Sequence, residues 1–257
     1  MESISNGIYY REQGEGEPLV LLHGFPLDGT MWDEQLAFFS DKYRVITPDL
    51  RGCGLSEATE TTSMDQMADD VASLLHRLGL RKAIVAGFSM GGYVLFALLR
   101  RHPELVSGVI LTNTKAEADT EEGKAGRAKM AQSIREQGAA AAASAMLPKL
   151  LSPAASEEQR NRLQRMMLTQ KPQGLIAAVL AMADRPDSTA QLGSIRVPTL
   201  VIGAEGDTIM PFSGAEAMAA AIPGAVLRRI EGAGHAANVE RPELWNAAVR
   251  EWLDAAF

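Results

Sequence analysis

The stretch that most restricts the fold of this chain is Gly87-Phe88-Ser89-Met90-Gly91-Gly92. The preceding run, Lys82–Ala86, is apolar and has the length and β-branched content of a buried strand. The following run, Tyr93–Leu99, is apolar on nearly every side and then becomes basic at Arg100 and Arg101, as at the end of a buried helix. The pattern therefore places Ser89 at a sharp turn where a strand passes directly into a helix.

The spacing G-x-S-x-G in this stretch has a steric reason. Side chains two positions before or after the serine would collide with neighbouring backbone in so tight a turn. The turn would hold the Ser89 hydroxyl beyond the edge of a sheet and beside a helix N-terminus. A glycine-rich turn with an incidental serine gives the same motif, but the strand before it and the helix after it favour a nucleophilic serine. Such a serine also needs a base, an acid and an oxyanion hole.

Strand-like and helix-like segments alternate along most of the chain. We expect strands over residues 8–11, 18–22, 43–47, 82–86, 106–112, 198–203 and 226–230. Helices are expected between them, over residues 30–41, 64–78, 93–101, 211–221 and 242–255. This alternation predicts an α/β fold with a doubly wound, mostly parallel sheet. The 257 residues, 46% of them hydrophobic, suit one large domain of this kind, or one domain carrying an insertion.

A block without strand-like sequence interrupts the alternation between Glu117 and about Ala183. Its helix-forming segments are 120–137, 139–147, 157–168 and 174–183, and four prolines punctuate them: Pro148, Pro153, Pro172 and Pro186. We interpret residues 116–189 as a helical cap over the carboxyl edge of the sheet, with residues 1–115 and 190–257 as the core. An independent helical domain is the alternative, but the helices are short and their linkers brief.

Charge and composition argue against several classes of protein. The formal net charge is −7 and no basic stripe is present, which argues against a nucleic-acid partner. The single Cys53 cannot form an internal disulfide, and no Cys/His cluster has the spacing of metal ligands. Residues 1–7 are polar and acidic, unlike a signal peptide, and no apolar run approaches the roughly 20 residues that span a bilayer. We therefore expect a cytoplasmic protein without a membrane partner.

A serine nucleophile needs a base, and the chain has four histidines. His76 falls on the polar side of an amphipathic helix, and His102 follows two arginines at a helix end. His23 begins the glycine loop after the strand at 18–22, and we expect it to support that loop. By elimination, His235 is the candidate base, because it follows the last strand in a flexible glycine turn. A surface-loop histidine is the alternative interpretation.

The candidate acid and oxyanion hole also follow strands. Asp207 comes after the penultimate strand and is the favoured partner for the histidine, while Glu205, nearer the strand, is the rival. A simple turn aspartate is the alternative. The backbone N–H of Met90, directly after the serine, and that of Phe25, in the first glycine loop, are placed to form the oxyanion hole.

Together these segments resemble the α/β-hydrolase superfamily over the whole chain. The matching pieces are His23-Gly24-Phe25-Pro26, Asp49–Ser56, Gly87–Gly92, Gly203–Asp207 and Gly232–His235. Within the superfamily, the chain looks most like small esterases and enol-lactonases with a cap between sheet strands six and seven. The resemblance implies a serine carboxylesterase for small to medium, mostly apolar esters, acting through an acyl-enzyme with a Ser89–His235–Asp207 triad and no metal or organic cofactor.

Several related activities remain open. One is a lactonase, enol-lactonase or carbon–carbon hydrolase of a catabolic pathway; others are a cofactor-free haloperoxidase and a ligand receptor that kept the pocket. Epoxide hydrolases and haloalkane dehalogenases are disfavoured, because they carry an aspartate where this chain has Ser89. In some branches the acid follows the sixth strand, where this chain has Asn113, and that leaves Asp207 as the carboxylate.

The cap supplies candidate pocket residues for a small-molecule ester or lactone. Methionine and leucine side chains at helical spacing would pack against the core or line the pocket, where methionine tolerates varied shapes: Met146, Leu147, Met166 and Met167. Arg185 could hold a substrate carboxylate or form a salt link that anchors the cap. A monomer and a homodimer are both compatible with the sequence.

Overall fold

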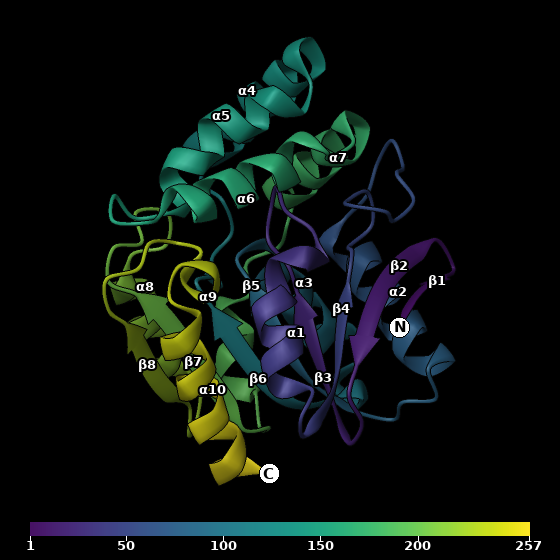
Figure 1. Ribbon diagram of the computed structural model, residues 1–257, viewed down its shortest axis with the longest axis vertical. Coiled ribbons are helices and arrows are strands. Elements are labelled where there is room, and N and C mark those ends of the chain that lie inside the picture. Colours follow the sequence, from purple (N-terminus) through teal and green to yellow (C-terminus); the bar gives the residue numbers. More distant parts are fainter.

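The computed structural model describes all of residues 1–257 and contains one eight-stranded sheet (Figure 1). The strand order is β1-β2-β4-β3-β5-β6-β7-β8. The pairs β1–β2 and β2–β4 are antiparallel and all other pairs are parallel. The strands are β1 (Glu2–Ser5), β2 (Ile8–Gln13), β3 (Glu17–Leu22), β4 (Tyr43–Pro48), β5 (Ala83–Phe88), β6 (Val106–Thr112), β7 (Thr199–Ala204) and β8 (Val226–Ile230). The mostly parallel sheet predicted from the alternating pattern is confirmed.

Helices bury both faces of this sheet. Helices α1 (Asp33–Phe39) and α10 (Pro242–Ala256) cover one face, and α2 (Met64–Arg77), α3 (Met90–Arg101) and α8 (Phe212–Ala221) cover the other. Along β3, Leu19 and Leu21 join one hydrophobic cluster while Val20 and Leu22 join the opposite one. Because alternate side chains of a strand point to opposite faces, the continuous apolar runs of the central strands follow from burial on both sides.

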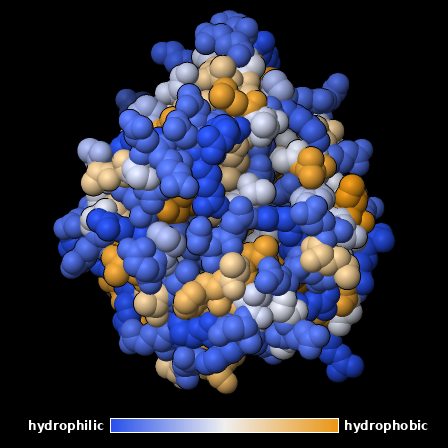
Figure 2. All heavy atoms as spheres, in the orientation of Figure 1, coloured by the Kyte–Doolittle hydropathy of each residue, from blue (hydrophilic) through white to orange (hydrophobic).

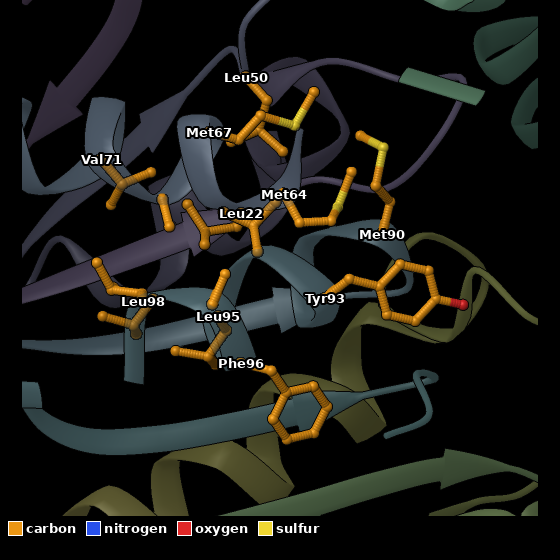
Figure 3. Close-up of a cluster of buried hydrophobic side chains, with 14 of the residues drawn as sticks. Leu22, Leu50, Met64, Met67, Val71, Met90, Tyr93, Leu95, Phe96 and Leu98 are labelled. Carbon is orange, nitrogen blue, oxygen red and sulfur yellow. The ribbon is translucent and has the colours of Figure 1, made fainter. Parts of the chain in front are cut away.

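The cluster beneath α2 and α3 supports the turn at Ser89 directly. Figure 3 shows Met64 and Met67 of α2 and Leu95 of α3 on the same side as Leu22 of β3, while the ring of Phe96 of α3 points away from Leu22 within the same buried cluster. These side chains are fully or almost fully buried. The helix that begins just after Ser89 is therefore fixed by apolar contacts along its length.

Four helices separate β6 from β7 in the chain: α4 (Glu121–Gln137), α5 (Ala139–Leu150), α6 (Glu157–Leu168) and α7 (Pro172–Ala183). They lie together over the edge of the sheet where the parallel strands end (Figure 1). Helix α4 buries only Ala131 and Ile134. Helix α7, by contrast, is buried along most of its length.

The sequence pattern misses or misplaces a few elements. Strand β1 and the four-residue helix α9 (Ala237–Glu240) are too short to show a period. The predicted helix 30–41 is a 3₁₀ helix, Gly29–Trp32, followed by α1. Pro148 lies inside α5 instead of ending it, and Pro172 begins α7, where a missing N–H costs nothing.

Hydrophilic residues cover most of the face shown in Figure 2, and the hydrophobic residues on it form small separate groups. No helix has both the length and the apolar character needed to cross a bilayer.

Candidate active site

The turn between β5 and α3 holds Ser89 in a strained conformation, with φ of 52° and ψ of −114°. A Cβ on Gly87 would lie 2.6 Å from the Gly91 carbonyl oxygen, and a Cβ on Gly91 would collide with the Leu22 carbonyl oxygen. Only glycine fits at these two positions, as the steric argument from the sequence predicts. Ser89 is the one residue between Ala83 and Leu98 that is not fully buried.

Three loops at the carboxyl ends of parallel strands bring Ser89, His235 and Asp207 together. Ser89 follows β5, Asp207 follows β7 and His235 follows β8. The His235 Nε2 atom lies 2.9 Å from the Ser89 Oγ atom, and its Nδ1 atom lies 2.7 Å from Asp207 Oδ2. The imidazole and the carboxylate are both shielded from solvent, with side-chain exposures of 1% and 0%.

The surroundings of Asp207 keep it ionised. Burial alone raises its pKa, but the hydrogen bond and charge of His235, with hydrogen bonds from Asn113 and Met210, outweigh burial and hold the pKa of Asp207 below its ordinary value. Its Oδ1 atom also accepts from the backbone N–H of Ile209 at 2.9 Å. Since a carboxylate can only accept, His235 Nδ1 carries the proton, and Nε2 of the neutral imidazole is free to accept from the Ser89 hydroxyl.

Asn113 extends this array beyond the three predicted residues. Its Nδ2 atom donates to Asp207 Oδ2 at 2.9 Å, and its Oδ1 atom accepts from the Thr112 hydroxyl. That hydroxyl in turn accepts from the indole N–H of Trp245 at 3.1 Å. The sequence identifies Asn113 only as an amide in an alternative acid position; its contact with Asp207 depends on the parallel pairing of β6 with β7.

The rival candidates from the sequence lie elsewhere. Glu205 accepts hydrogen bonds from Arg229 and from the backbone N–H of Gly232, away from the imidazole. His23 is buried, and its Nε2 atom accepts from the Leu50 backbone N–H at 2.9 Å, so it joins its glycine loop to the loop after β4. His76 is exposed and His102 binds Asp69.

The loop after β3 lies against Ser89. A Cβ on Gly24 would lie 3.0 Å from the Ser89 Cβ atom and closer still to the Phe88 ring. The Phe25 backbone N–H donates no hydrogen bond to the protein. Met90 is the first residue of α3, and the first N–H groups of a helix have no acceptor within it. Both groups proposed for the oxyanion hole therefore remain available on the Ser89 side of the sheet.

A cavity of about 600 Å³ opens beside Phe25. Thr208 and Ile209, next to Asp207, form part of its wall, and α4 and α5 supply the opposite side. That side carries both apolar and cationic groups: Met130, Met146, Arg127 and Lys149.

Of the predicted pocket residues, only Met146 lines this cavity. Met166 and Met167 pack into the hydrophobic cluster on the α1 and α10 face, and Leu147 packs against that cluster. Arg185 is buried and pairs with Asp119 at 2.8 Å. Of the two roles considered for Arg185 from the sequence, the structure therefore places it in an internal salt link and not in this cavity. Helical spacing identifies these side chains as inward-facing but does not distinguish a core contact from a cavity wall.

The chemistry available to this site is proton transfer and nucleophilic attack. A neutral imidazole that accepts from a serine hydroxyl and is held by a buried carboxylate can remove the hydroxyl proton as the oxygen attacks a carbonyl. No group of His, Cys, Asp and Glu side chains is arranged to hold a metal ion.

Known proteins of similar sequence and structure include hydrolases. Residues 17–242 match the family described as "alpha/beta hydrolase fold". The solved structure of a thermophilic esterase from Thermogutta terrifontis is 40% identical, with a TM-score of 0.94, over 97% of this chain and 93% of that one. The enol-lactonase structure from Burkholderia xenovorans LB400 is 29% identical, with a TM-score of 0.90, over 99% and 100% of the two chains.

A sequence relative extends the comparison to an enzyme with a named substrate. 3-Oxoadipate enol-lactonase 2 of Acinetobacter baylyi is 31% identical over 92% of this chain and 88% of its own length. The family match spans most of the chain, and it agrees with the sheet order and with the loops that carry Ser89, Asp207 and His235. The chain therefore belongs to the α/β-hydrolase family, as its sequence motifs predict.

Proposed function

We propose that this hydrolase cleaves carboxylic esters of small to medium, mostly apolar substrates through an acyl-enzyme on Ser89. The observation that carries the proposal is the unbroken hydrogen-bonded array Ser89–His235–Asp207, with the half-buried Ser89 at one end and a buried carboxylate at the other. The similarity to an esterase and to enol-lactonases supports the same bond type.

The proposed reaction uses the array in two stages. His235 Nε2 takes the Ser89 proton as Oγ attacks the ester carbonyl, and the N–H groups of Phe25 and Met90 stabilise the oxyanion. Collapse of the tetrahedral intermediate releases the alcohol, which receives the proton from His235. Water, activated by the same imidazole, then releases the acid and restores Ser89. Asp207 holds the tautomer and stabilises the imidazolium in both stages.

The cavity favours a second candidate, a lactonase for substrates that carry a carboxylate. Met130, Met146 and Ile209 would accept an apolar group, but Lys149 lies on the same wall and forms no ion pair within the chain. Arg127 also lines the cavity, although its Nε atom donates to Asp119. An anionic substrate group would pair with the free Lys149 ammonium, as an enol-lactone of a dicarboxylic acid would allow.

Matched substrates separate the two candidates. A panel of uncharged aryl esters, uncharged lactones and carboxylate-bearing lactones would be tested with wild type and Ser89→Ala. The esterase proposal expects the highest kcat/KM on aryl esters, and loss of about 10⁵- to 10⁶-fold in Ser89→Ala. Ordinary turnover in that variant would refute the nucleophile.

The lactonase candidate is tested with a charge-matched control. Lys149→Ala should raise KM for a carboxylate-bearing lactone and leave uncharged esters unaffected, because only the former loses an ionic partner. Lys129→Ala, an exposed lysine of α4 outside the cavity, removes the same charge. Equal effects of the two variants would exclude a direct contact with the substrate.

A further inference from the structure

Glu240, the last residue of α9, is buried although it forms no ion pair. Its Oε2 atom accepts from the backbone N–H of Gly234 at 2.8 Å and from that of Ser152 at 3.0 Å. Its Oε1 atom binds the Ser152 hydroxyl. A buried carboxylate is costly unless donors satisfy it, and here every donor is a neutral group of one of two loops.

These two loops are the one that carries His235 and the one that ends α5. Gly234 immediately precedes His235, and Ser152 lies two residues after the end of α5. A Cβ on Gly234 would lie 2.6 Å from the Ser152 nitrogen, so the two backbones are in direct contact. Glu240 is thus the shared acceptor that joins them.

A second contact holds the other side of the histidine. The Ala236 backbone N–H donates to the Leu150 carbonyl oxygen at 2.7 Å. The residues before and after His235 are therefore both tied to residues 150–152, one through Glu240 and one directly. On the core side, the Gly206 N–H donates to Ala233 at 2.8 Å and joins the histidine loop to the loop of Asp207.

We propose that Glu240 is a positioning residue for His235: it fixes the imidazole against Ser89 by bridging the histidine loop to the end of α5. This inference rests on the proposed function, in which His235 is the base. It gives the four-helix segment a role in catalysis besides covering the site, because Leu150 accepts from the histidine loop directly and Ser152 shares Glu240 with it.

The geometry predicts an unusual order among substitutions. In Glu240→Gln the amide oxygen can still accept from Gly234 and Ser152, and the amide N–H can donate to the Ser152 hydroxyl. Glu240→Asp keeps the charge but withdraws the carboxylate by one methylene, about 1.5 Å. If position matters, glutamine should substitute well and aspartate poorly; if charge matters, the order should be reversed.

The experiment measures kcat and KM on an aryl ester, with the rate of fluorophosphonate labelling, for Glu240→Gln, Glu240→Asp and Glu240→Ala. We expect kcat and the labelling rate to fall about 10- to 100-fold in the aspartate and alanine variants, while KM stays within about threefold of wild type. In the glutamine variant, kcat and the labelling rate should also stay within about threefold of wild type. Thermal melting shows whether each variant is folded. If the alanine variant does not fold, the comparison of Glu240→Gln with Glu240→Asp still tests the proposal.

Gln159→Ala is the matched control. The Gln159 side chain donates to the carbonyl oxygens of Val239 and Glu240, so it also links the four-helix segment to α9 without contacting Gly234. We expect its kcat to match wild type. A fall equal to that of Glu240→Ala, a dead glutamine variant, or full kcat in the aspartate and alanine variants would each overturn the proposal. Absence of esterase activity and labelling in wild type would instead refute the proposed function.

Discussion

The sheet and the four-helix segment contribute to the same site through different kinds of contact. On the sheet side, backbone geometry positions Ser89, Asp207 and His235. Each follows a strand, and a Cβ atom on Gly87 or Gly91 would collide with neighbouring backbone. On the other side, α4 is largely exposed, while α6 and α7 pack apolar side chains into the hydrophobic clusters and polar side chains add links at a few points.

The attachment points illustrate this difference. Gln170, between α6 and α7, donates to Asp28 and accepts from the Gly54 N–H, while Lys171 donates to the Ser56 carbonyl oxygen. Such contacts can change one at a time without disturbing a strand. In the proposed function, the sheet side holds Ser89, Asp207 and His235, whereas the four-helix segment bounds the cavity and meets the histidine loop at Glu240.

After Ser89→Ala, the largest effect should follow another change on the sheet side, at Asp207. Asp207→Asn should lower kcat by about 10²- to 10⁴-fold, because His235 loses its counter-charge and its tautomer control. Asn113 already contacts the Asp207 oxygen that binds His235. Adding Asn113→Asp should therefore restore about tenfold, or about 1.4 kcal/mol of transition-state stabilisation. Steady-state kinetics on an aryl ester measures both, and full activity in the single variant would exclude Asp207 as the acid.

A smaller effect, on stability rather than chemistry, should follow loss of an attachment point. Gln170→Ala leaves an Asp28 oxygen and the Gly54 N–H without their partners, which should lower the free energy of unfolding by about 1–3 kcal/mol. Urea denaturation measures the loss. If residues 116–189 form a cap, subtilisin should also cut the variant sooner near residues 115–125 or 184–192. First cleavage within the sheet strands would contradict the division into core and cap.

Acid should have a still smaller effect on stability through the ion pair between Asp119, just before α4, and Arg185, just after α7. Burial raises the pKa of Asp119, but hydrogen bonds and charges from Arg185 and Arg127 lower it from 3.8 to about 2. The folded state therefore favours the carboxylate, and its contribution is complete above the ordinary pKa and is lost as the pH falls toward 2. The pH-dependent part of the contribution of Asp119 to the free energy of unfolding should be about 1–2 kcal/mol, allowing for solvent screening.

Asp119→Asn provides the measurement. Its stability deficit against wild type should narrow as the pH falls from about 5 to about 3, since only wild type has this carboxylate to protonate. The free energy of unfolding of both proteins would be measured in urea at each pH. An equal difference between them at every pH would show that the ion pair with Arg185 does not contribute to acid sensitivity.

The smallest effect should come from the exposed face of α4. Gln132 donates to Glu136 at 2.6 Å on that face and touches neither the cavity nor the core. Gln132→Ala should change the free energy of unfolding by less than about 0.5 kcal/mol and leave kcat unchanged. A large loss of activity would mean that the exposed face of α4 takes part in the chemistry.

The sequence was most informative where function depends on local structure. Ser89, Asp207 and His235 each follow a recognisable strand, and parallel strands bring their carboxyl ends to one edge. Gln170 and Asp28, by contrast, are 142 residues apart, and no local pattern pairs them. The sequence also gives no sign of Glu240, because a single helical turn such as α9 is too short to show a hydrophobic period.

If Ser89 is the nucleophile and His235 activates it, a serine-directed reagent should form a covalent adduct on Ser89. Wild type would be treated with a fluorophosphonate, and the modified residue identified by peptide mass mapping alongside Ser89→Ala and His235→Ala. We predict one adduct per chain, on Ser89, absent from Ser89→Ala and strongly slowed in His235→Ala. An adduct on another residue, or equal labelling of Ser89→Ala, would contradict it.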